Sequence, residues 1–263
     1  MPFSAQQGGD LYAGLPRKGG LGLIQIFGGT DQGKVRSTNQ DAYRFAVLGE
    51  ACAYAVLCDG MGGENGGHIA STRAVEIISQ ALERSLRQPT ADLKATMVSA
   101  CSAANAVVHD LAVSDESLRG MGTTVVAAVV RGDQLCVAHA GDSRAYLVTP
   151  EGTLERLTRD HSVVQLLVDH GEITEEQATN HPKRHYITRA LGIEPELELE
   201  YLEREFVSGR LLLCSDGLYN YAPPQDHLDL ITTCASEQDI YLLIDEANKA
   251  GGPDNITAVI VAK

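Results

Sequence analysis

Short apolar runs that end in turn residues alternate along the chain with longer segments whose apolar positions recur at helical spacing. The runs predict β-strands, because four to eight consecutive apolar residues between turn signals are typical of strands buried in a sheet. Gly49, Gly132 and Gly152 mark tight turns between consecutive runs. Strands are predicted at residues 21–27, 43–48, 53–58, 123–130, 134–140, 145–148, 154–157, 196–202, 211–214 and 256–262.

The helical segments are fewer and longer than the strands. Residues 67–87 carry apolar side chains at a spacing of about 3.6 residues, among them Ile69 and Ile77. Pro89 breaks the chain, and a second helix is predicted from residue 90 or 91 to residue 113. Shorter helices are predicted at residues 162–171, 174–179 and 237–250.

This order of elements predicts an α+β protein. Consecutive strands joined by tight turns favour antiparallel pairing, and two long helices early in the chain with one late helix indicate helical layers outside the sheets. We therefore expect a single-domain α-β-β-α sandwich of two largely antiparallel sheets flanked by helices, over residues 21–263. Residues 1–20 are rich in glycine and aperiodic, so they are expected to form a loose tail.

The chain is strongly acidic, with 21 basic and 35 acidic residues and a net charge of −14. Such a charge disfavours general binding to nucleic acid or to anionic lipid surfaces, so neither partner is expected. The start of the chain lacks the basic and apolar regions of a signal peptide. The best apolar run, residues 123–130, is far shorter than a membrane span. These features predict a cytoplasmic protein that does not bind membranes.

The six cysteines form no C-x-x-C pair, and most of them lie in apolar runs. A free cysteine in such a run behaves as a small buried hydrophobe. This interpretation is favoured over a disulfide framework or a zinc site. The residues are Cys52, Cys58, Cys101, Cys136, Cys214 and Cys234.

Five aspartates carry the candidate chemistry. Four of them are interpreted as lying at the ends of buried strands, and the fifth lies in the polar stretch 36–41. A single aspartate of this kind is more often a turn cap, but five with this pattern indicate anionic ligands that converge on a cation. They are Asp41, Asp59, Asp142, Asp216 and Asp254.

An all-oxygen ligand set of this kind favours Mg²⁺ or Mn²⁺ over zinc. Two such ions about 3.5–4 Å apart can activate a bridging water and polarise phosphoryl oxygens. Gly60 and Gly217 are expected to let the backbone turn sharply, so that a carbonyl can also face the metal. Arg36, five residues before Asp41, offers a planar fork suited to phosphate. Together these residues predict a phosphate ester hydrolase.

The same residues lie in a series of motifs that resembles the protein phosphatase 2C family of metal-dependent serine/threonine protein phosphatases, in its short bacterial form. The resemblance covers residues 21–263 with the motifs in family order, and the ordered set is far more specific than any single motif. The motifs are Val35-Arg36-Ser37-Thr38-Asn39-Gln40-Asp41-Ala42, Asp59-Gly60-Met61-Gly62-Gly63, Gly120-Met121-Gly122-Thr123-Thr124, Gly141-Asp142-Ser143-Arg144-Ala145-Tyr146, Leu157-Thr158-Arg159-Asp160-His161-Ser162, Ile187-Thr188-Arg189-Ala190-Leu191-Gly192, Cys214-Ser215-Asp216-Gly217-Leu218 and Asp254-Asn255-Ile256-Thr257.

The resemblance implies a role for each candidate metal ligand. Asp59 would bridge two metal ions, and Asp216 and Asp254 would complete the first site. The carbonyl of Gly60 would face the second ion, which Asp41 would bind directly or through water.

The resemblance also implies two further roles. Asp142, together with Asp216, would hold a third and weaker metal ion. Arg36 would bind the substrate phosphate, so Arg36 and Asp59 are the candidate catalytic residues.

The resemblance further implies a reaction and its partners. Water activated by the metal would attack phosphorus in line and release serine or threonine without a phosphoenzyme. Residues 163–190 correspond to the flap that contacts the phosphorylated protein substrate. A serine/threonine kinase is the implied partner, and a monomer is expected.

The chain departs from the family pattern near the second metal. Gln40 replaces a common Glu, and Met61 replaces the histidine that could act as general acid in eukaryotic members. Glu64 and His68 are exchanged relative to many bacterial members. The group that protonates the leaving oxygen is therefore left open.

Two other functions stay open at this point. A catalytically silent relative would bind phosphoproteins or regulate a kinase, but it would have little reason to keep all five aspartates and Arg36. A hydrolase of small phosphate esters is disfavoured by the flap-like segment.

Several polar residues are interpreted as structural. His139 and His161 are expected to be packed or hydrogen-bonded, with a role near the phosphate as the weaker alternative. The pair His181 and His185 is interpreted as flap surface rather than a metal site. The glutamates of the strand predicted at 196–202 are interpreted as solvated.

Overall fold

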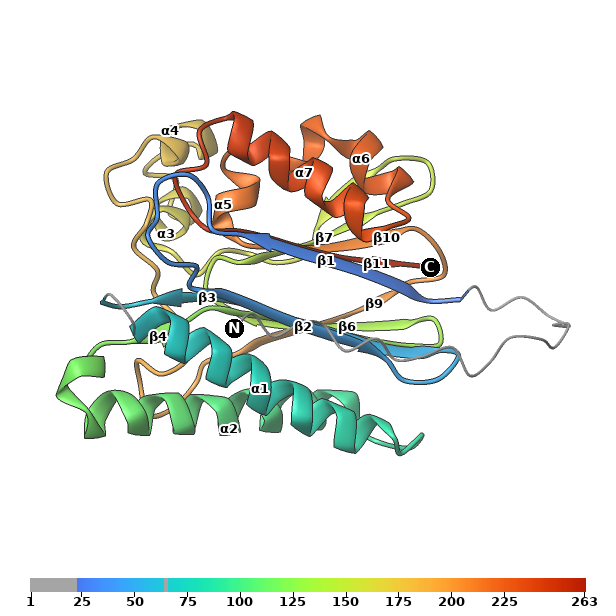
Figure 1. Ribbon diagram of the computed structural model, residues 1–263, viewed down its shortest axis with the longest axis horizontal. Helices are drawn as coiled ribbons and strands as arrows, with labels where there is room; N and C mark the ends of the chain where they lie inside the picture. Colours follow the sequence, from blue (N-terminus) through green and yellow to red (C-terminus); the bar gives the residue numbers. More distant parts are fainter. Residues whose placement is uncertain (1–22, 64–65) are drawn as a thin grey trace, which may run out of the picture.

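Two stacked β-sheets lie between two layers of helices in the computed structural model of the protein, which describes residues 23–63 and 66–263 (Figure 1). The predicted α-β-β-α sandwich is therefore confirmed. The tail predicted at 1–20 and the residue Glu64 lie outside the described residues.

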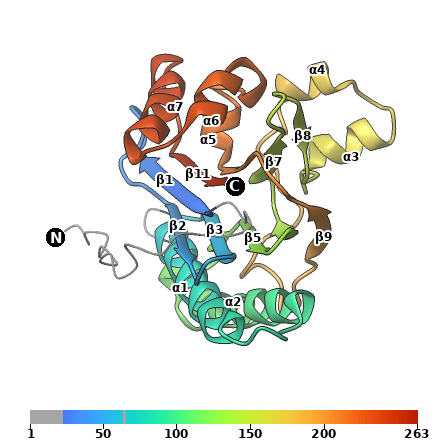
Figure 2. The ribbon, with the colours of Figure 1, turned by 90° about the vertical axis from the view of Figure 1, so that its right-hand side faces the viewer.

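One sheet has the strand order β1-β11-β10-β7-β8, with every neighbouring pair antiparallel. Its strands are β1 (Gln25–Asp31), β7 (Arg144–Val148), β8 (Leu154–Arg156), β10 (Arg210–Cys214) and β11 (Ile256–Ala262). Its outer face is covered by the late helices, which the view along the sheets shows on one side of the sandwich (Figure 2). They are α5 (Asp216–Tyr219), the 3₁₀ turn η2 (Pro224–Asp226), α6 (Leu228–Thr233) and α7 (Glu237–Lys249).

The other sheet has the order β2-β3-β5-β6-β9 and is also antiparallel. Its strands are β2 (Asp41–Val47), β3 (Cys52–Met61), β5 (Val125–Arg131), β6 (Gln134–Ala140) and β9 (Glu200–Glu205), and the short β4 (Gly122–Thr123) pairs with β3. The helices α1 (Gly66–Leu86) and α2 (Leu93–Ser114) pack on its outer face, followed by the turn η1 (Glu116–Leu118).

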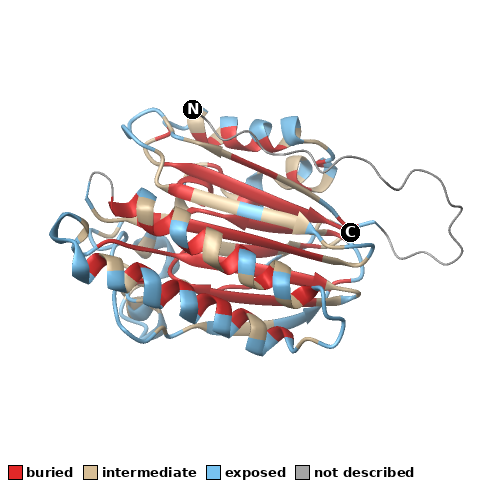
Figure 3. Cartoon of the chain, turned by 60° about the horizontal axis from the view of Figure 1, so that its bottom comes forward, coloured by how far each residue is buried: buried red, intermediate tan, exposed pale blue. Residues whose placement is uncertain are grey.

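The inner strands of the two sheets, β3, β5, β6, β10 and β11, are buried on both faces (Figure 3). In β5, Val125, Ala127 and Val129 pack toward α1 and α2, while the alternating Val126, Ala128 and Val130 pack toward the opposite sheet. Period-two alternation therefore divides one apolar run between two cores, which explains why this run has no polar face.

The helices pack through one apolar face each. α1 buries Ala70, Ala74, Ile78 and Leu82, which recur at four-residue spacing. α2 begins at Leu93 rather than at 90 or 91, because the side chain of Asp92 accepts the N–H of Ala95 and caps the helix.

The structure corrects one predicted strand. Residues 196–199 are not in a strand; β9 begins at Glu200 and continues to Glu205. The preceding chain is held by Asn105 of α2, whose side chain donates to the carbonyls of Glu194 and Pro195 at 3.0 and 3.1 Å. The short helices α5 and α6 were not predicted, because four to six residues are too few to show a helical period.

Residues 163–190 contain two short helices, α3 (Val163–Asp169) and α4 (Glu175–Thr179), as the sequence predicts. They lie beside the β8 edge of the first sheet, on the side of the late helices (Figure 2). All six cysteines are free, and five of them are buried. Among residues 23–63 and 66–263, none of the helices combines the length and the apolar character needed to cross a bilayer.

Candidate metal centre

Four of the five aspartates line one cleft. Asp59, Asp142, Asp216 and Asp254 face it together with Arg36. In the first sheet, the end of β10 pairs with the start of β11, next to Asp216 and Asp254. In the second sheet, the start of β2 pairs with the end of β3, which places Asp41 opposite Asp59. Each sheet therefore brings its carboxylates to one end. The other lining residues are Gln40, Gly60, Met61, Gly62, Thr124, His185, Ile187 and Asn255.

Two of the aspartates are not where the sequence placed them. Asp59 lies within β3, which continues to Met61, rather than after it. Asp254 precedes β11 rather than following a strand. Both still reach the cleft, because Asp59 lies near the C-terminal end of β3 and Asp254 lies just before the N-terminal end of β11.

Asp41 is buried behind the cleft and is directly opposite Asp59 in the β2–β3 register. Its Oδ2 accepts hydrogen bonds from the hydroxyls of Ser215 at 2.7 Å and Thr257 at 2.6 Å. Its Oδ1 is buried and has no hydrogen-bond partner among the described residues. Burial raises the pKa of Asp41 to about 6 despite these two donors. The Asp41 carboxylate is therefore fixed through Oδ2, while its buried Oδ1 lacks a partner among the described residues. A metal ion or a metal-bound ligand would satisfy this oxygen.

The backbone of Asp59 is fixed by two threonines. The Asp59 N–H donates to the hydroxyl of Thr124 at 2.9 Å, and the Asp59 carbonyl accepts from the Thr123 hydroxyl and the Thr124 N–H, each at 2.9 Å. The hydroxyl of Thr124 lies 2.7 Å from that of Ser143, beside Asp142. The Gly122-Thr123-Thr124 motif thus ties together two of the carboxylate-bearing segments.

The carboxylates act on one another electrostatically. Burial raises the pKa of Asp59 and of Asp216 well above the usual value, and the neighbouring carboxylates raise both further. Burial, with Asp160 nearby, raises the pKa of Asp142 to about 7, although Arg144 opposes this shift. Carboxylates gathered this closely cannot all ionise at neutral pH unless cations balance them.

Asp254 is oriented from both sides. Its Oδ2 accepts the Arg36 Nη2 donor at 2.7 Å, and its Oδ1 accepts the N–H of Asn255 at 2.9 Å. Arg36 itself is half exposed at the rim of the cleft. The pair places a guanidinium beside the carboxylate cluster.

Asn255 is a site residue whose role the sequence did not show. Its Oδ1 accepts the N–H of Gln40 at 2.8 Å, and its Nδ2 donates to the carbonyls of Gln32 and Thr38 at 2.8 and 3.0 Å. It therefore fixes the loop that carries Arg36 to the segment that carries Asp254. The signal available in the sequence was only its position next to Asp254.

The two motif glycines serve close packing rather than sharp turns. Neither Gly60 nor Gly217 has a positive φ. A Cβ on Gly60 would lie 2.1 Å from the carbonyl oxygen of Gly67 in α1, and a Cβ on Gly217 would lie 2.0 Å from that of Asn255. The turn predicted at these positions is therefore wrong, although Gly60 lines the cleft as expected.

The residues that depart from the family pattern also have defined positions. The Gln40 side chain donates to the Gly63 carbonyl at 3.1 Å, and Met61 lines the cleft. His68 is exposed on α1 and does not line this cleft. From the flap, His185 and Ile187 do line it.

These observations fit a divalent metal centre. The donor set is all oxygen, one buried carboxylate oxygen is free, and the grouped carboxylates favour a cation. Asp59, Asp216 and Asp254, with the Gly60 carbonyl and Asp41, could hold such ions, and Asp142 lies beside them.

Comparison with known proteins gives the same family. The family model described as Protein phosphatase 2C matches residues 29–240. The serine/threonine phosphatase stp of Listeria monocytogenes is 36% identical over 239 residues, which are 89% of this chain and 94% of that protein. Protein phosphatase PhpP of Streptococcus pneumoniae is 35% identical over 235 residues, 89% of this chain and 95% of that one.

Solved structures show the same architecture. The serine/threonine phosphatase PstP/Ppp of Mycobacterium tuberculosis has a TM-score of 0.82 at 34% identity, covering 91% of this chain and 98% of that one. The catalytic domain of PstP in complex with two manganese ions has a TM-score of 0.80 at 34% identity, covering 91% and 98%. The ordered motifs, the carboxylate cleft and these matches together show that the chain belongs to the protein phosphatase 2C family.

Proposed function

We propose that the protein hydrolyses phosphoserine and phosphothreonine in proteins, using a metal-activated water and no phosphoenzyme. Membership of the family makes the chain a protein serine/threonine phosphatase. The proposal concerns the mechanism, the metal ligands and the substrate-binding residues.

The observation that carries the proposal is the carboxylate arrangement itself. Asp41 presents a buried oxygen that has no partner within the described part of the chain, behind a cleft in which Asp59, Asp216 and Asp254 converge. When bound, two Mn²⁺ or Mg²⁺ ions would supply an activated water and polarise the phosphoryl oxygens. The relative solved with two manganese ions supports this metal class.

The residues of the chain have distinct roles in this proposal. Asp59 would bridge the two ions, with Asp216 and Asp254 at one and Asp41 and the Gly60 carbonyl at the other. The cleft position of Asp142 beside Asp216 supports a third, weaker site.

A cysteine phosphoenzyme is not supported by this cleft. None of its lining residues is a cysteine. Burial raises the pKa of Cys58 well above the ordinary thiol value and raises that of Cys214 to about 12, so both stay protonated. Direct attack by water is the alternative that the cleft supports.

The test is release of phosphate from a phosphothreonine peptide with Mn²⁺, with EDTA, and with Asp216→Ala. We expect release only with metal and intact Asp216. A folded, metal-loaded protein that releases no phosphate would instead favour the silent phosphoprotein-binding regulator. The kinase partner, the monomeric state and the cytoplasmic location stay predictions.

Arg36→Lys should raise KM for the peptide and the inhibition constant for inorganic phosphate, each about tenfold, because an ammonium cannot make the two parallel hydrogen bonds of a guanidinium. Half-saturation by Mn²⁺ should change by no more than about twofold, since the cation next to Asp254 is retained. Steady-state kinetics measure all three. Arg73→Lys, on the exposed face of α1, is the control. Unchanged phosphate inhibition in Arg36→Lys would contradict the assigned role.

A further inference from the structure

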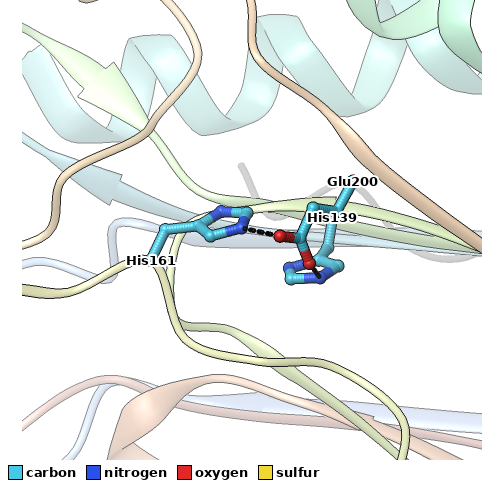
Figure 4. Close-up of side chains that lie close together, drawn as sticks. All are labelled: His139, His161 and Glu200. Carbon is cyan, nitrogen blue, oxygen red and sulfur yellow. Dashed lines mark ion pairs between the residues drawn. The ribbon is translucent and has the colours of Figure 1, made fainter. Parts of the chain in front are cut away.

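A second polar cluster lies outside the carboxylate cleft. It joins His139 of β6, His161 in the segment after β8, and Glu200, the first residue of β9 (Figure 4). The two imidazole rings stack with centroids 4.7 Å apart and planes 8° apart, and both residues are buried. Glu200 Oε2 lies 3.2 Å from His139 Nε2, and Glu200 Oε1 lies 3.3 Å from His161 Nε2. Glu200 is exposed, as the sequence predicts, but its carboxylate also faces the two buried histidines.

The residue types resemble a metal site, but the hydrogen bonds do not fit one. The N–H of Gly141 donates to His161 Nδ1 at 3.2 Å, so in the neutral ring the proton lies on Nε2. That nitrogen faces Glu200 and has no lone pair for a cation. Arg189 Nη1 lies 3.2 Å from the same nitrogen and 3.6 Å from Glu200 Oε1, which adds positive charge at the same place. The cluster is thus a carboxylate with a neighbouring guanidinium and His161 rather than a cation site, and neither nitrogen of His139 has a hydrogen-bond partner among the described residues.

The charges agree with this assignment. Burial lowers the pKa of His161, and it lowers the pKa of His139 to about 4, so both rings are neutral at pH 7. Burial would raise the pKa of Glu200, but the hydrogen bond from His161 and then the charge interactions with His161, His139 and Arg189 outweigh it and hold that pKa below the usual value. Glu200 is therefore ionised, and Arg189 lies between it and Glu198, whose Oε2 is 3.0 Å from Arg189 Nε.

His161 connects the two segments that frame the metal cleft. Its N–H donates to the carbonyl of Gly141 at 3.0 Å, and its carbonyl accepts the N–H of Thr188 at 2.7 Å. Gly141 precedes the candidate ligand Asp142, and Thr188 follows Ile187, which lines the cleft from the returning end of the flap. A displacement of His161 would move both segments relative to each other.

We propose that Glu200 is a positioning residue for the phosphatase reaction. By holding His161 and Arg189, it fixes the flap, residues 163–189, to the turn that carries Asp142, so that the flap receives a protein substrate in the correct position. This inference rests on the proposed function. A small phosphate ester does not need the flap, because the metal ions that the carboxylates would hold, together with Arg36, would bind its phosphate, so the two substrate classes should respond differently.

The test replaces Glu200 with Gln, which keeps the shape of the side chain and removes its charge. KM for the phosphothreonine peptide should rise about tenfold, the effect of losing one charged hydrogen bond, while kcat for p-nitrophenyl phosphate should stay within about twofold. Glu205→Gln, an exposed position at the far end of the same strand, is the matched control and should change neither. Arg189→Gln should mimic Glu200→Gln, and the double variant should show no added effect, since both changes break one network.

Amide hydrogen exchange gives a readout that does not depend on activity. The Thr188 and Gly141 amides should exchange faster in Glu200→Gln than in the wild type and in Glu205→Gln, because both bond to His161. Equal effects on both substrates, or unchanged exchange at these amides, would overturn the positioning role. A wild type that hydrolyses neither substrate would refute the proposed function instead, and the exchange experiment would still decide the role of Glu200.

Discussion

Replacing Asp59 with Asn is expected to lower phosphate release from a phosphothreonine peptide by about 10³-fold or more at saturating Mn²⁺. Asp59 lies in the same cleft as three other carboxylates. Because Thr123 and Thr124 fix its backbone, its carboxylate has a defined position that a neighbouring side chain cannot take over. An amide keeps the size of the side chain but removes the charge and one oxygen ligand.

The control for this change is Asp245→Asn on the exposed face of α7. It makes the same chemical replacement far from the cleft and should keep full activity. Circular dichroism should show both variants folded. Activity of Asp59→Asn within tenfold of the wild type would refute the bridging role.

The second large effect concerns the metal-free protein. Burial, and after it the neighbouring carboxylates, raise the pKa of Asp59 well above its ordinary value of 3.8, so the folded state holds a proton that the unfolded state has released. For this group, the contribution to stability is greatest below pH 4 and is lost as the pH rises toward the raised pKa. We expect the EDTA-treated wild type to be less stable than Asp59→Asn, by a difference that grows from pH 5 to pH 8.

The comparison with Asp59→Asn removes other titrations from the result. His139, with its pKa lowered to about 4, acts in the opposite direction and weakens folding as the pH falls below 6.5, but it does so equally in both proteins. Urea unfolding at each pH measures the difference. A difference that does not depend on pH would contradict the electrostatic account.

Adding Mn²⁺ should reverse the order of stability. A ligand at 100 times its dissociation constant stabilises the folded state by about 2.7 kcal/mol per site. The wild type should gain this at pH 8, where the carboxylates are ionised, and Asp59→Asn should gain much less. Equal gains in both proteins would place the bound metal elsewhere.

The local patterns were sufficient for most of the fold. Period-two and 3.6-residue spacing predicted the strands and the long helices, because each element buries a continuous apolar face. The strand predicted at 196–202 failed for a tertiary reason. Its alternation is genuine, but Asn105 of α2 holds the carbonyls of Glu194 and Pro195, and pairing with β6 begins only at Glu200.

The candidate site was also largely predictable as a list of residues. The aspartates and Arg36 stood out because oxygen ligands and a guanidinium are the groups that metal and phosphate require. Their geometry did not follow from the sequence. That Gly60 is needed for contact with Gly67, rather than for a turn, depends on how closely α1 approaches β3.

The sequence by itself determined the kinds of element, the ligand chemistry and the family, since these depend on local pattern and on which side chains are present. Only the tertiary structure decided which groups meet. The pairing of β2 with β3 places Asp41 opposite Asp59, and β6 and β9 bring Glu200 to His139, so that His161 can join it. These contacts join residues that are 18 to 61 positions apart in the chain. Contacts over such separations leave no periodic pattern in the sequence from which they could be predicted.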